Sequence, residues 1–207
     1  MEKDPVVATT STYDQIAVTY ADRWQDRSML TADAARFAAL LPSPGVVCDV
    51  GCGPGFDTAV LREKGINAVA LDRSWGMMQT GRVAHGVDVP FVQADMRHLP
   101  LGKTAVSGLW AAASLLHLPR EDVAVVLPNF ARVLQPNGIL YLSLKLGDGA
   151  QWTAAAAHDE ALSRFFTYWQ SETLDPLLLQ AGFHIVEGWQ SNGRSAQWLV
   201  RLARRTS

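Results

Sequence analysis

Three glycines at alternate positions follow a short apolar run that contains an aspartate. The run spans residues 46–50 and includes Asp49, and the glycines are Gly51, Gly53 and Gly55. Such a run predicts a buried strand, and the pattern at 58–64 predicts a helix after the glycines. A strand, a glycine turn and a helix in this order let a ligand lie against bare backbone at the carboxyl edge of a parallel sheet.

The spacing of the glycines indicates which ligand this is. A dinucleotide site has the pattern G-x-G-x-x-G, whose last glycine permits close packing of helix and strand. Counted from Gly51, that glycine would fall on Phe56, so the match to a dinucleotide site fails. The pattern present is Asp-x-Gly-x-Gly-x-Gly, from Asp49 to Gly55. Taken alone, this motif could also be a tight turn without a ligand.

Two further aspartates follow at equal intervals. Asp72 ends the apolar run 68–71, 23 residues after Asp49, and Asp95 comes another 23 residues later. Steps of this length fit repeated strand–helix–strand units. The two oxygens of Asp72 can accept both hydroxyls of a ribose, and Asp95 can accept from the exocyclic amine of adenine, with Met96 as an apolar face for the ring. The alternative is that each aspartate only caps a strand or a helix.

The rest of the chain continues an alternating α/β pattern. Further strands are predicted at 106–112, 139–144, 183–189 and 196–203, the last two as a hairpin. Helices are predicted after Ser74, which suits an N-cap, and at 119–134 and 171–181. Pro128 is expected to kink or split its helix, and the alanine run 154–157 is expected to be helical.

Together these features resemble the class I S-adenosylmethionine-dependent methyltransferases over roughly residues 12–203. The glycine motif, Asp72 and Asp95 match the cofactor positions of that family. The resemblance implies a Rossmann-like α/β fold with a seven-stranded, mostly parallel sheet, an antiparallel last strand and helices on both faces. It also implies S-adenosyl-L-methionine as cofactor and S-adenosyl-L-homocysteine as product.

Two further segments resemble the small bacterial methyltransferases of small molecules. These are Ala113-Ser114-Leu115-Leu116-His117 after the fourth strand and Arg164-Phe165-Phe166-Thr167-Tyr168 after the fifth. Two departures from the family pattern occur in the fourth strand. Val106-Ser107 replaces a Phe-Asp pair, which affects strand packing. Ala111 and Ala112 stand where methyltransferases of nucleic-acid bases have Asn-Pro-Pro-Tyr or Asp-Pro-Pro-Tyr, which argues against methylation of DNA or RNA adenine.

Position by position, the resemblance also implies a set of cofactor-binding residues. The glycine turn approaches the amino-acid end of the cofactor, and Asp49 helps to hold its ammonium group, usually through water. The residues expected at the cofactor are Tyr13, Tyr20, Asp49, Gly51, Cys52, Gly53, Gly55, Asp72, Arg73, Met77, Asp95, Met96, Ala111 and Ala112.

The N-terminal segment has a helical pattern with an apolar stripe. The stripe consists of Tyr13, Ile16, Ala17, Tyr20 and Trp24. One interpretation is a helix that packs this face on the core. The other is a lid over cofactor and acceptor, as in the family, with Tyr13 or Tyr20 reaching the methionine moiety, and both can be true of one helix.

The methyl acceptor is expected beside the carboxyl ends of the fourth and fifth strands. His117 is the candidate catalytic base, because an unperturbed pKa of about 6.5 suits proton transfer near neutrality; a buried structural histidine is the alternative. His98 and Lys145 are expected to face solvent, unless Lys145 pairs with an acidic acceptor. Arg164 is expected to form a surface salt bridge or to anchor a carboxylate or phosphate. The substrate residues predicted are Trp24, His117, Lys145, Arg164, Phe165 and Tyr168.

Composition fits a single domain. The chain has 207 residues, 48% of them hydrophobic and 18% charged, and a net charge of −2. The expected parts are a helical lid (12–41), a cofactor-binding core (42–146), a substrate-side insert (147–170), and a C-terminal helix and hairpin (171–205). Cys48 and Cys52 lack the companions of a zinc site, so no metal is expected.

These patterns favour a cytoplasmic enzyme that methylates an O, N or C atom of a small, partly apolar molecule. No membrane or nucleic-acid partner is expected, because neither an apolar span nor a basic patch is evident, and the protein is expected to be a monomer or homodimer. The alternatives are a macromolecular acceptor such as RNA or protein, which the near-neutral charge disfavours, and a non-catalytic protein that binds S-adenosylmethionine. A dehydrogenase ranks third, because Phe56 counts against it.

Overall fold

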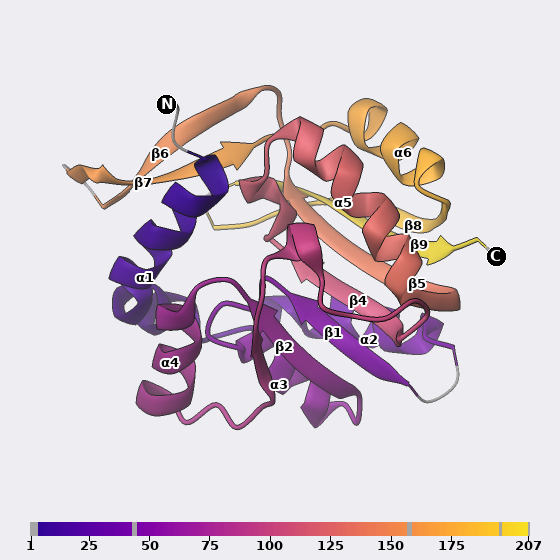
Figure 1. Ribbon diagram of the computed structural model, residues 1–207, viewed down its shortest axis with the longest axis horizontal. Coiled ribbons are helices and arrows are strands. Elements are labelled where there is room, and N and C mark those ends of the chain that lie inside the picture. The colour runs from indigo at the N-terminus through magenta and orange to yellow at the C-terminus, as the bar shows by residue number, and fades with distance from the viewer. Residues whose placement is uncertain (1–3, 43–44, 157–158, 195, 207) are drawn as a thin grey trace.

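The computed structural model describes residues 4–42, 45–156, 159–194 and 196–206. A seven-stranded sheet with the order β3-β2-β1-β4-β5-β9-β8 forms its centre (Figure 1). Strands β1 to β5 are mutually parallel, and β9 runs antiparallel to both of its neighbours, β5 and β8. The predicted sheet is therefore confirmed. The strands are β1 (Val46–Val50), β2 (Asn67–Asp72), β3 (Phe91–Gln93), β4 (Val106–Ala112), β5 (Leu134–Lys145), β8 (Phe183–Asn192) and β9 (Gln197–Arg205).

Helices cover both faces of the sheet. On one face, Phe37 of α2 (Thr31–Leu40) and Leu61 of α3 (Phe56–Glu63) pack with Trp110 of β4. On the other face, α5 (Arg120–Val133) and α6 (Ser171–Gln180) bury residues such as Leu127 and Leu174. Neighbouring strand residues, for example Leu109 and Trp110, belong to opposite cores because side chains alternate along a strand.

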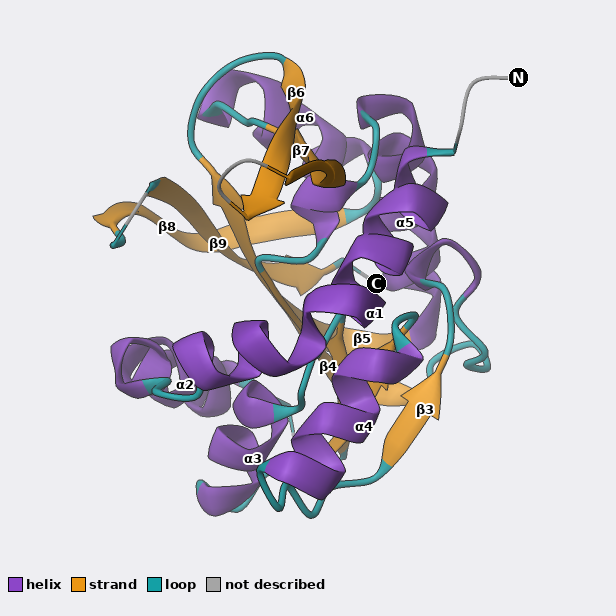
Figure 2. Cartoon of the chain, turned by 90° about the vertical axis from the view of Figure 1, so that its left-hand side faces the viewer, coloured by secondary structure: helices purple, strands orange, loops and turns teal. Residues whose placement is uncertain are grey.

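Helices α1 (Pro5–Trp24) and α4 (Trp75–Ala84) lie side by side near the carboxyl ends of the first strands (Figure 2). Helix α1 also contacts β7 (Asp159–Thr167), which pairs with β6 (Ala150–Ala156) in a separate hairpin. Three 3₁₀ turns complete the fold: η1 (Ser28–Leu30), η2 (Met96–His98) and η3 (Leu115–His117). Within the described residues, no helix has the length and apolar character needed to cross a membrane.

Three local expectations from the sequence are wrong. The first helix begins at Pro5 and not near residue 12, because Asp4 caps it: its side chain accepts from the backbone N–H groups of Val6 and Val7. The alanines at 154–156 lie in β6, where cross-strand pairing with β7 outweighs their helix propensity; residue 157 is outside the described residues. Helix α5 is not split at Pro128, because the apolar residues around that position are buried against the sheet.

Candidate functional site

A cavity of about 440 Å³ opens at the carboxyl ends of β1, β2, β4 and β5. Its walls come from the glycine turn after β1, from α1, from the segment after β4 and from β7. This is the edge of the sheet where the sequence predicts both cofactor and acceptor. The cavity has two ends that differ in charge: an acidic end at β1 to β3, and a basic end at β5 and β7.

The glycine turn forms the floor of the acidic end. Gly51, Gly53 and Gly55 all have positive φ, from 55° to 85°, a region that L side chains avoid. A Cβ built on Gly51 would lie 2.4 Å from the Cβ of Ser114, so a side chain there would clash. Bare backbone at this turn therefore lines the cavity at Gly51 and Gly53, as predicted, whereas Gly55 turns away and begins α3.

Asp72 lies beside this turn at the end of β2. Its Oδ2 accepts from the N–H of Gly53 at 2.7 Å, and its Oδ1 accepts from the N–H of Ser74 at 2.7 Å. Each oxygen keeps further acceptor capacity, and the residue lines the cavity. Burial raises the pKa of Asp72, and these backbone N–H groups work in the opposite direction. Ser74 is the N-cap of α4, as predicted, and accepts from the N–H of Met77.

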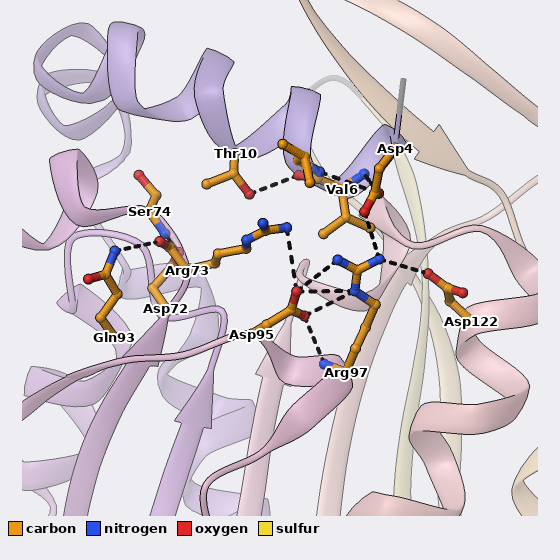
Figure 3. A network of polar contacts seen from close by, with 11 residues as sticks. Asp4, Val6, Thr10, Asp72, Arg73, Ser74, Gln93, Asp95, Arg97 and Asp122 are labelled. Atoms are coloured by element: carbon orange, nitrogen blue, oxygen red, sulfur yellow. Dashed lines mark hydrogen bonds and ion pairs between the residues drawn. The ribbon is translucent and has the colours of Figure 1, made fainter. Parts of the chain in front are cut away.

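Asp95 is the centre of a charged network at the far side of the acidic end (Figure 3). Its two oxygens accept from Arg97, with Nη2 at 2.8 Å from Oδ2, and Arg73 Nη1 lies 3.4 Å away. Burial alone would raise the pKa of Asp95, but hydrogen bonds from Arg97 lower it. Arg97 also binds Asp4 at the start of α1. Asp95 thus reaches the cavity, as predicted, but with Arg97 already bound to it.

Asp49 does not line the cavity. It is 2% exposed, and its Oδ2 accepts from the hydroxyl of Thr58 at 2.6 Å. Burial, with the nearby charge of Asp57, raises the pKa of Asp49 well above its usual range. The carboxylate that does line the cavity beyond the glycine turn is Asp57, which pairs with Arg27 and accepts from Trp110 Nε1 at 3.0 Å. Asp49 is therefore placed behind the cavity wall, and its expected role at the ammonium group through water stays a prediction.

Helix α1 closes the cavity with its aromatic stripe. Tyr13, Tyr20 and Trp24 all line it, and their rings lie next to one another, with centroids 5.4 and 6.4 Å apart. The opposite side of the helix is held by α4, because Asp14 accepts from Ser74 Oγ at 2.6 Å and from the N–H of Gly76 at 2.8 Å. The aromatic residues of the stripe therefore face the cavity, while Ala17 is buried as a core residue.

Two threonines bind α1 to the hairpin on its other side. The hydroxyl of Thr12 donates to the carbonyl of Ser163 at 2.8 Å, and Thr9 Oγ1 accepts from the N–H of Phe165 at 3.0 Å. Helix α1 is thus held by α4 on one side and by β7 on the other.

His117 lies at the basic end, 2.9 Å from the Tyr13 hydroxyl through Nε2 and 2.7 Å from the Phe165 carbonyl through Nδ1. A carbonyl can only accept, so Nδ1 carries the proton and Nε2 accepts from Tyr13. Burial, together with the charges of Arg164 and Lys145, lowers the pKa of His117 to about 3. The imidazole is therefore neutral near pH 7, and the lone pair of Nε2 is occupied by the Tyr13 hydroxyl. His98 is exposed, as predicted.

Lys145 and Arg164 both line the cavity, so the expectations of a solvent-facing lysine and a surface salt bridge are wrong. The Lys145 ammonium lies 3.4 Å from the ring centroid of Phe166, and the Arg164 guanidinium carbon lies 5.3 Å from the same centroid. Burial and the charge of Arg164 lower the pKa of Lys145 to about 8.

Strand alternation explains which residues of β7 reach the cavity. Arg164 and Phe166 line it, whereas Phe165, between them, packs on Trp152 of the hairpin partner. Tyr168 follows the end of β7 and binds Gln151. Of the aromatic residues that the sequence offers as a wall of the acceptor pocket, Phe166 therefore lines the cavity, whereas Phe165 and Tyr168 do not. Ala111 is likewise buried in the core, while Ala112 lines the cavity.

The remaining residues predicted at the cofactor lie where expected. Cys52, Arg73, Met77 and Met96 line the acidic end. Four important side chains were missed: Asp14, Arg27, Asp57 and Arg97. Asp57 continues the glycine motif by one more alternate position, and that spacing could have identified it; the other three depend on contacts between distant segments.

This sheet order, a glycine turn with an aspartate after β2, and a cavity across the carboxyl ends of the strands together define a class I S-adenosylmethionine-dependent methyltransferase. Residues 47–138 match the family model described as "Methyltransferase domain". The chain belongs to this class, whose cofactor is S-adenosyl-L-methionine, and the site fits that cofactor because the bare glycine backbone and the Asp72 oxygens face the cavity.

Comparison with curated proteins identifies methyltransferases of several kinds. The chain is 30% identical to an O-methyltransferase of Pyrenophora dematioidea over 156 residues, which cover 72% of this chain and 58% of that protein. It is 34% identical over 131 residues to a trans-aconitate 2-methyltransferase of Azoarcus sp. (strain BH72), which cover 58% of this chain and 50% of that protein. The chain thus spans about half the length of these curated relatives.

A solved structure covers the whole chain. The 1,6-didemethyltoxoflavin-N1-methyltransferase of Burkholderia thailandensis, with bound 1,6-didemethyltoxoflavin and S-adenosylhomocysteine, superposes with a TM-score of 0.75 at 25% identity. The match covers 100% of this chain and 92% of that one.

Proposed function

We propose that the protein transfers the methyl group of S-adenosyl-L-methionine to an O, N or C atom of a small, partly apolar molecule. The observation that carries this proposal is one cavity that joins the glycine turn and Asp72 to His117 and the aromatic ring of Phe166. Relatives named for small acceptors, such as the trans-aconitate 2-methyltransferase and the toxoflavin N1-methyltransferase, support a small acceptor here.

In this proposal the acidic end holds the cofactor. The oxygens of Asp72 accept the ribose hydroxyls, Met96 and Asp95 lie at the adenine, and the backbone at Gly51 and Gly53 lies along the amino-acid end. Tyr13 and Tyr20 cover the cavity from α1, which excludes water from the reacting groups. The cofactor, when bound, supplies a methyl group on a positively charged sulfur, which a nucleophile can displace.

We propose that His117 accepts a proton from the acceptor where the methylated atom carries one. Its Nε2 lone pair is held by the Tyr13 hydroxyl, and its pKa of about 3 keeps it unprotonated in the free protein. Such a pKa makes it a weak base, so this role requires a bound acceptor whose negative charge raises the pKa of His117 toward neutrality. Because Tyr13 lies between Nε2 and the cavity, the hydroxyl passes the proton: it gives its own to Nε2 as it takes the acceptor's. Burial raises the pKa of Tyr13, so the phenol stays protonated between turnovers.

Formation of S-adenosylhomocysteine tests this function. The purified protein is supplied with S-adenosylmethionine and with panels of small phenols, hydroxy acids and amines, and separately with RNA and with protein. We expect turnover with a small molecule. Turnover confined to RNA or protein, or S-adenosylhomocysteine binding without turnover on any acceptor, contradicts the proposal.

Once an acceptor is found, His117→Gln is expected to lower turnover by about 100-fold or more, the range of general base catalysis, without changing the affinity for S-adenosylhomocysteine. His98→Gln is the matched control, because His98 is exposed. Equal turnover of His117→Gln and His98→Gln would leave His117 as a structural residue.

A further inference from the structure

Two cations in the cavity wall have no carboxylate among the described side chains. The ion pairs of the described residues include neither Lys145 nor Arg164, and Arg164 Nε is buried without a hydrogen-bond partner. The one polar contact of the Arg164 guanidinium among described atoms is a long one, from Nη1 to the Tyr13 hydroxyl at 3.4 Å. Both side chains are partly buried.

Three other cations that line or border the same cavity are paired. Arg27 binds Asp57, Arg73 lies by Asp95, and Arg97 binds both Asp95 and Asp4. Arg23, near the end of α1, also lines the cavity and has no ion pair among the described residues, but it is exposed. The partly buried cations without a carboxylate therefore lie at the basic end. Leaving a partly buried charge without its counter-charge is unfavourable, and proteins keep such an arrangement where a ligand supplies the counter-charge.

The two cations converge on one surface. The ammonium of Lys145 and the guanidinium of Arg164 both lie over the Phe166 ring, at 3.4 and 5.3 Å from its centroid, and the His117 ring lies 4.7 Å from it. The ring face stabilises each cation in part but cannot neutralise it. An anion bound in the cavity beside this ring would have both cations and His117 as neighbours.

We propose that the acceptor carries a carboxylate and that Arg164 and Lys145 bind it over the ring of Phe166. This inference rests on the proposed function, because it names the substrate class of that same cavity. A guanidinium matches a carboxylate in a planar, two-point arrangement, and the unpaired Nε is part of that edge. If the bound carboxylate is itself the group that is methylated, no base is needed. If a hydroxyl or amine elsewhere on the acceptor is methylated, His117 accepts its proton.

Benzoate and benzamide form a probe pair that tests the anchor without knowledge of the full acceptor. They share size and shape and differ in charge. Binding of each to the protein saturated with S-adenosylhomocysteine is measured by calorimetry at constant ionic strength. We expect benzoate to bind at least about tenfold more tightly than benzamide, and inorganic phosphate to bind less tightly than benzoate. Equal binding of benzoate and benzamide, or no measurable binding of benzoate, overturns the proposal; phosphate binding more tightly than benzoate overturns the carboxylate class.

Variants show whether the two named cations cause the preference. Arg164→Gln and Lys145→Met are expected to abolish the benzoate preference, whereas Arg82→Gln and Lys103→Met, which alter exposed cations outside the cavity, are expected to keep it. A preference that survives Arg164→Gln overturns the assignment. Binding of S-adenosylhomocysteine is measured in the same samples. A wild-type protein that does not bind S-adenosylhomocysteine contradicts the proposed function. A wild-type protein that binds S-adenosylhomocysteine but does not prefer benzoate contradicts only this inference.

Thermal unfolding of the free protein provides a readout that needs no ligand. Removing an unpaired, partly buried charge relieves its desolvation, so Lys145→Met is expected to raise the melting temperature relative to Lys103→Met. A lower melting temperature would mean that the ammonium is a structural group, which overturns the inference. Asp159→Asn with Glu160→Gln controls for hairpin-tip carboxylates, whose side chains lie outside the described ones. We expect this double variant to bind benzoate as the wild type does. If the double variant prefers benzoate to benzamide and the wild type does not, the inference is also overturned.

Discussion

The acidic and basic ends of the cavity differ in whether their charged side chains have partners within the protein. At the acidic end, each carboxylate has donors from the protein: two backbone N–H groups for Asp72, Arg97 for Asp95, and Arg27 with Trp110 for Asp57. At the basic end, Lys145 and Arg164 have an aromatic ring and no described carboxylate. The difference indicates that the acidic end is assembled in advance for a constant ligand, whereas the basic end needs its ligand to complete its charge balance.

The two ends also differ in how they are held. The glycine turn and Asp72 are parts of the central sheet and its first turns. His117 and Arg164 depend on contacts with α1 and β7, which are bound by side-chain hydrogen bonds from Thr9, Thr12 and Asp14. We therefore expect changes at the first end to act on cofactor affinity, and changes at the second to act on the acceptor.

The largest effect is expected from Asp72→Ala. The substitution removes the acceptor of the proposed ribose contacts, and losing charged hydrogen bonds costs about 2–3 kcal/mol, or about 30- to 150-fold in affinity. Calorimetric titration with S-adenosylhomocysteine measures this loss. Asp88→Asn, an exposed aspartate, is the control.

Asp72 also accepts from the N–H groups of Gly53 and Ser74, so its removal can loosen the turn itself. Asp72→Asn keeps one oxygen acceptor and is expected to fall between the wild type and Asp72→Ala in affinity. If Asp72→Ala binds S-adenosylhomocysteine as tightly as the wild type does, the acidic end does not hold the cofactor, and the proposed difference between the two ends of the cavity is wrong.

A smaller effect is expected from the titration of His117. Its pKa is about 3 in the folded protein and about 6.5 in an unfolded chain, so the unfolded state binds more protons between these values. The stability that this group contributes is fully present above pH 6.5 and is lost as the pH falls toward 3. The free energy of unfolding of the wild type should therefore fall relative to that of His117→Gln by about 1–2 kcal/mol between pH 7 and pH 5.

Chemical denaturation of both proteins at the two pH values measures this difference. His98→Gln is again the control, since an exposed histidine should show no such loss. Parallel stability profiles for the wild type and His117→Gln would mean that His117 is not buried neutral, and the basic end would lose its proposed base.

The smallest effect is expected from Asp14→Ala. Asp14 binds Ser74 Oγ and the N–H of Gly76 at the start of α4, and loss of such a capping contact costs about 1 kcal/mol. If α1 is a lid, the variant should also release S-adenosylhomocysteine several-fold faster in stopped-flow experiments. Gln15→Ala, an exposed neighbour on α1, should behave as the wild type. A release rate that does not change would argue that α1 is only a packing helix.

The sequence was sufficient to predict the sheet and most of the acidic end. Strand β1 is an apolar run that contains Asp49, and β2 is an apolar run that ends at Asp72. The glycines between β1 and α3 have positive φ, so local pattern and local geometry agree. Asp72, Arg73, Met77 and Met96 follow directly from that register. The sequence does not show that Asp49 is buried behind the cavity wall, because the period of a strand says which residues alternate but not which face meets the cavity.

The basic end depended on contacts that are distant in sequence. Lys145 and Arg164 converge on Phe166 only because β5 and β7 meet at this edge, and the alanines of β6 resemble a helix when their partner strand is unknown. Once the β7 strand is known, alternation selects Arg164 and Phe166 over Phe165. The hydrogen bond of Tyr13 to His117 joins positions 104 apart in the chain, and no local pattern indicates it.

The most direct test is a sequential titration, with S-adenosylhomocysteine to saturation and then benzoate into the same sample. The account predicts one site for each ligand, with benzoate bound as tightly to the S-adenosylhomocysteine complex as to the free protein, or more tightly. Loss of benzoate binding once S-adenosylhomocysteine is bound would contradict it, because Arg164 and Lys145 would then bind the carboxylate of the cofactor and not that of an acceptor.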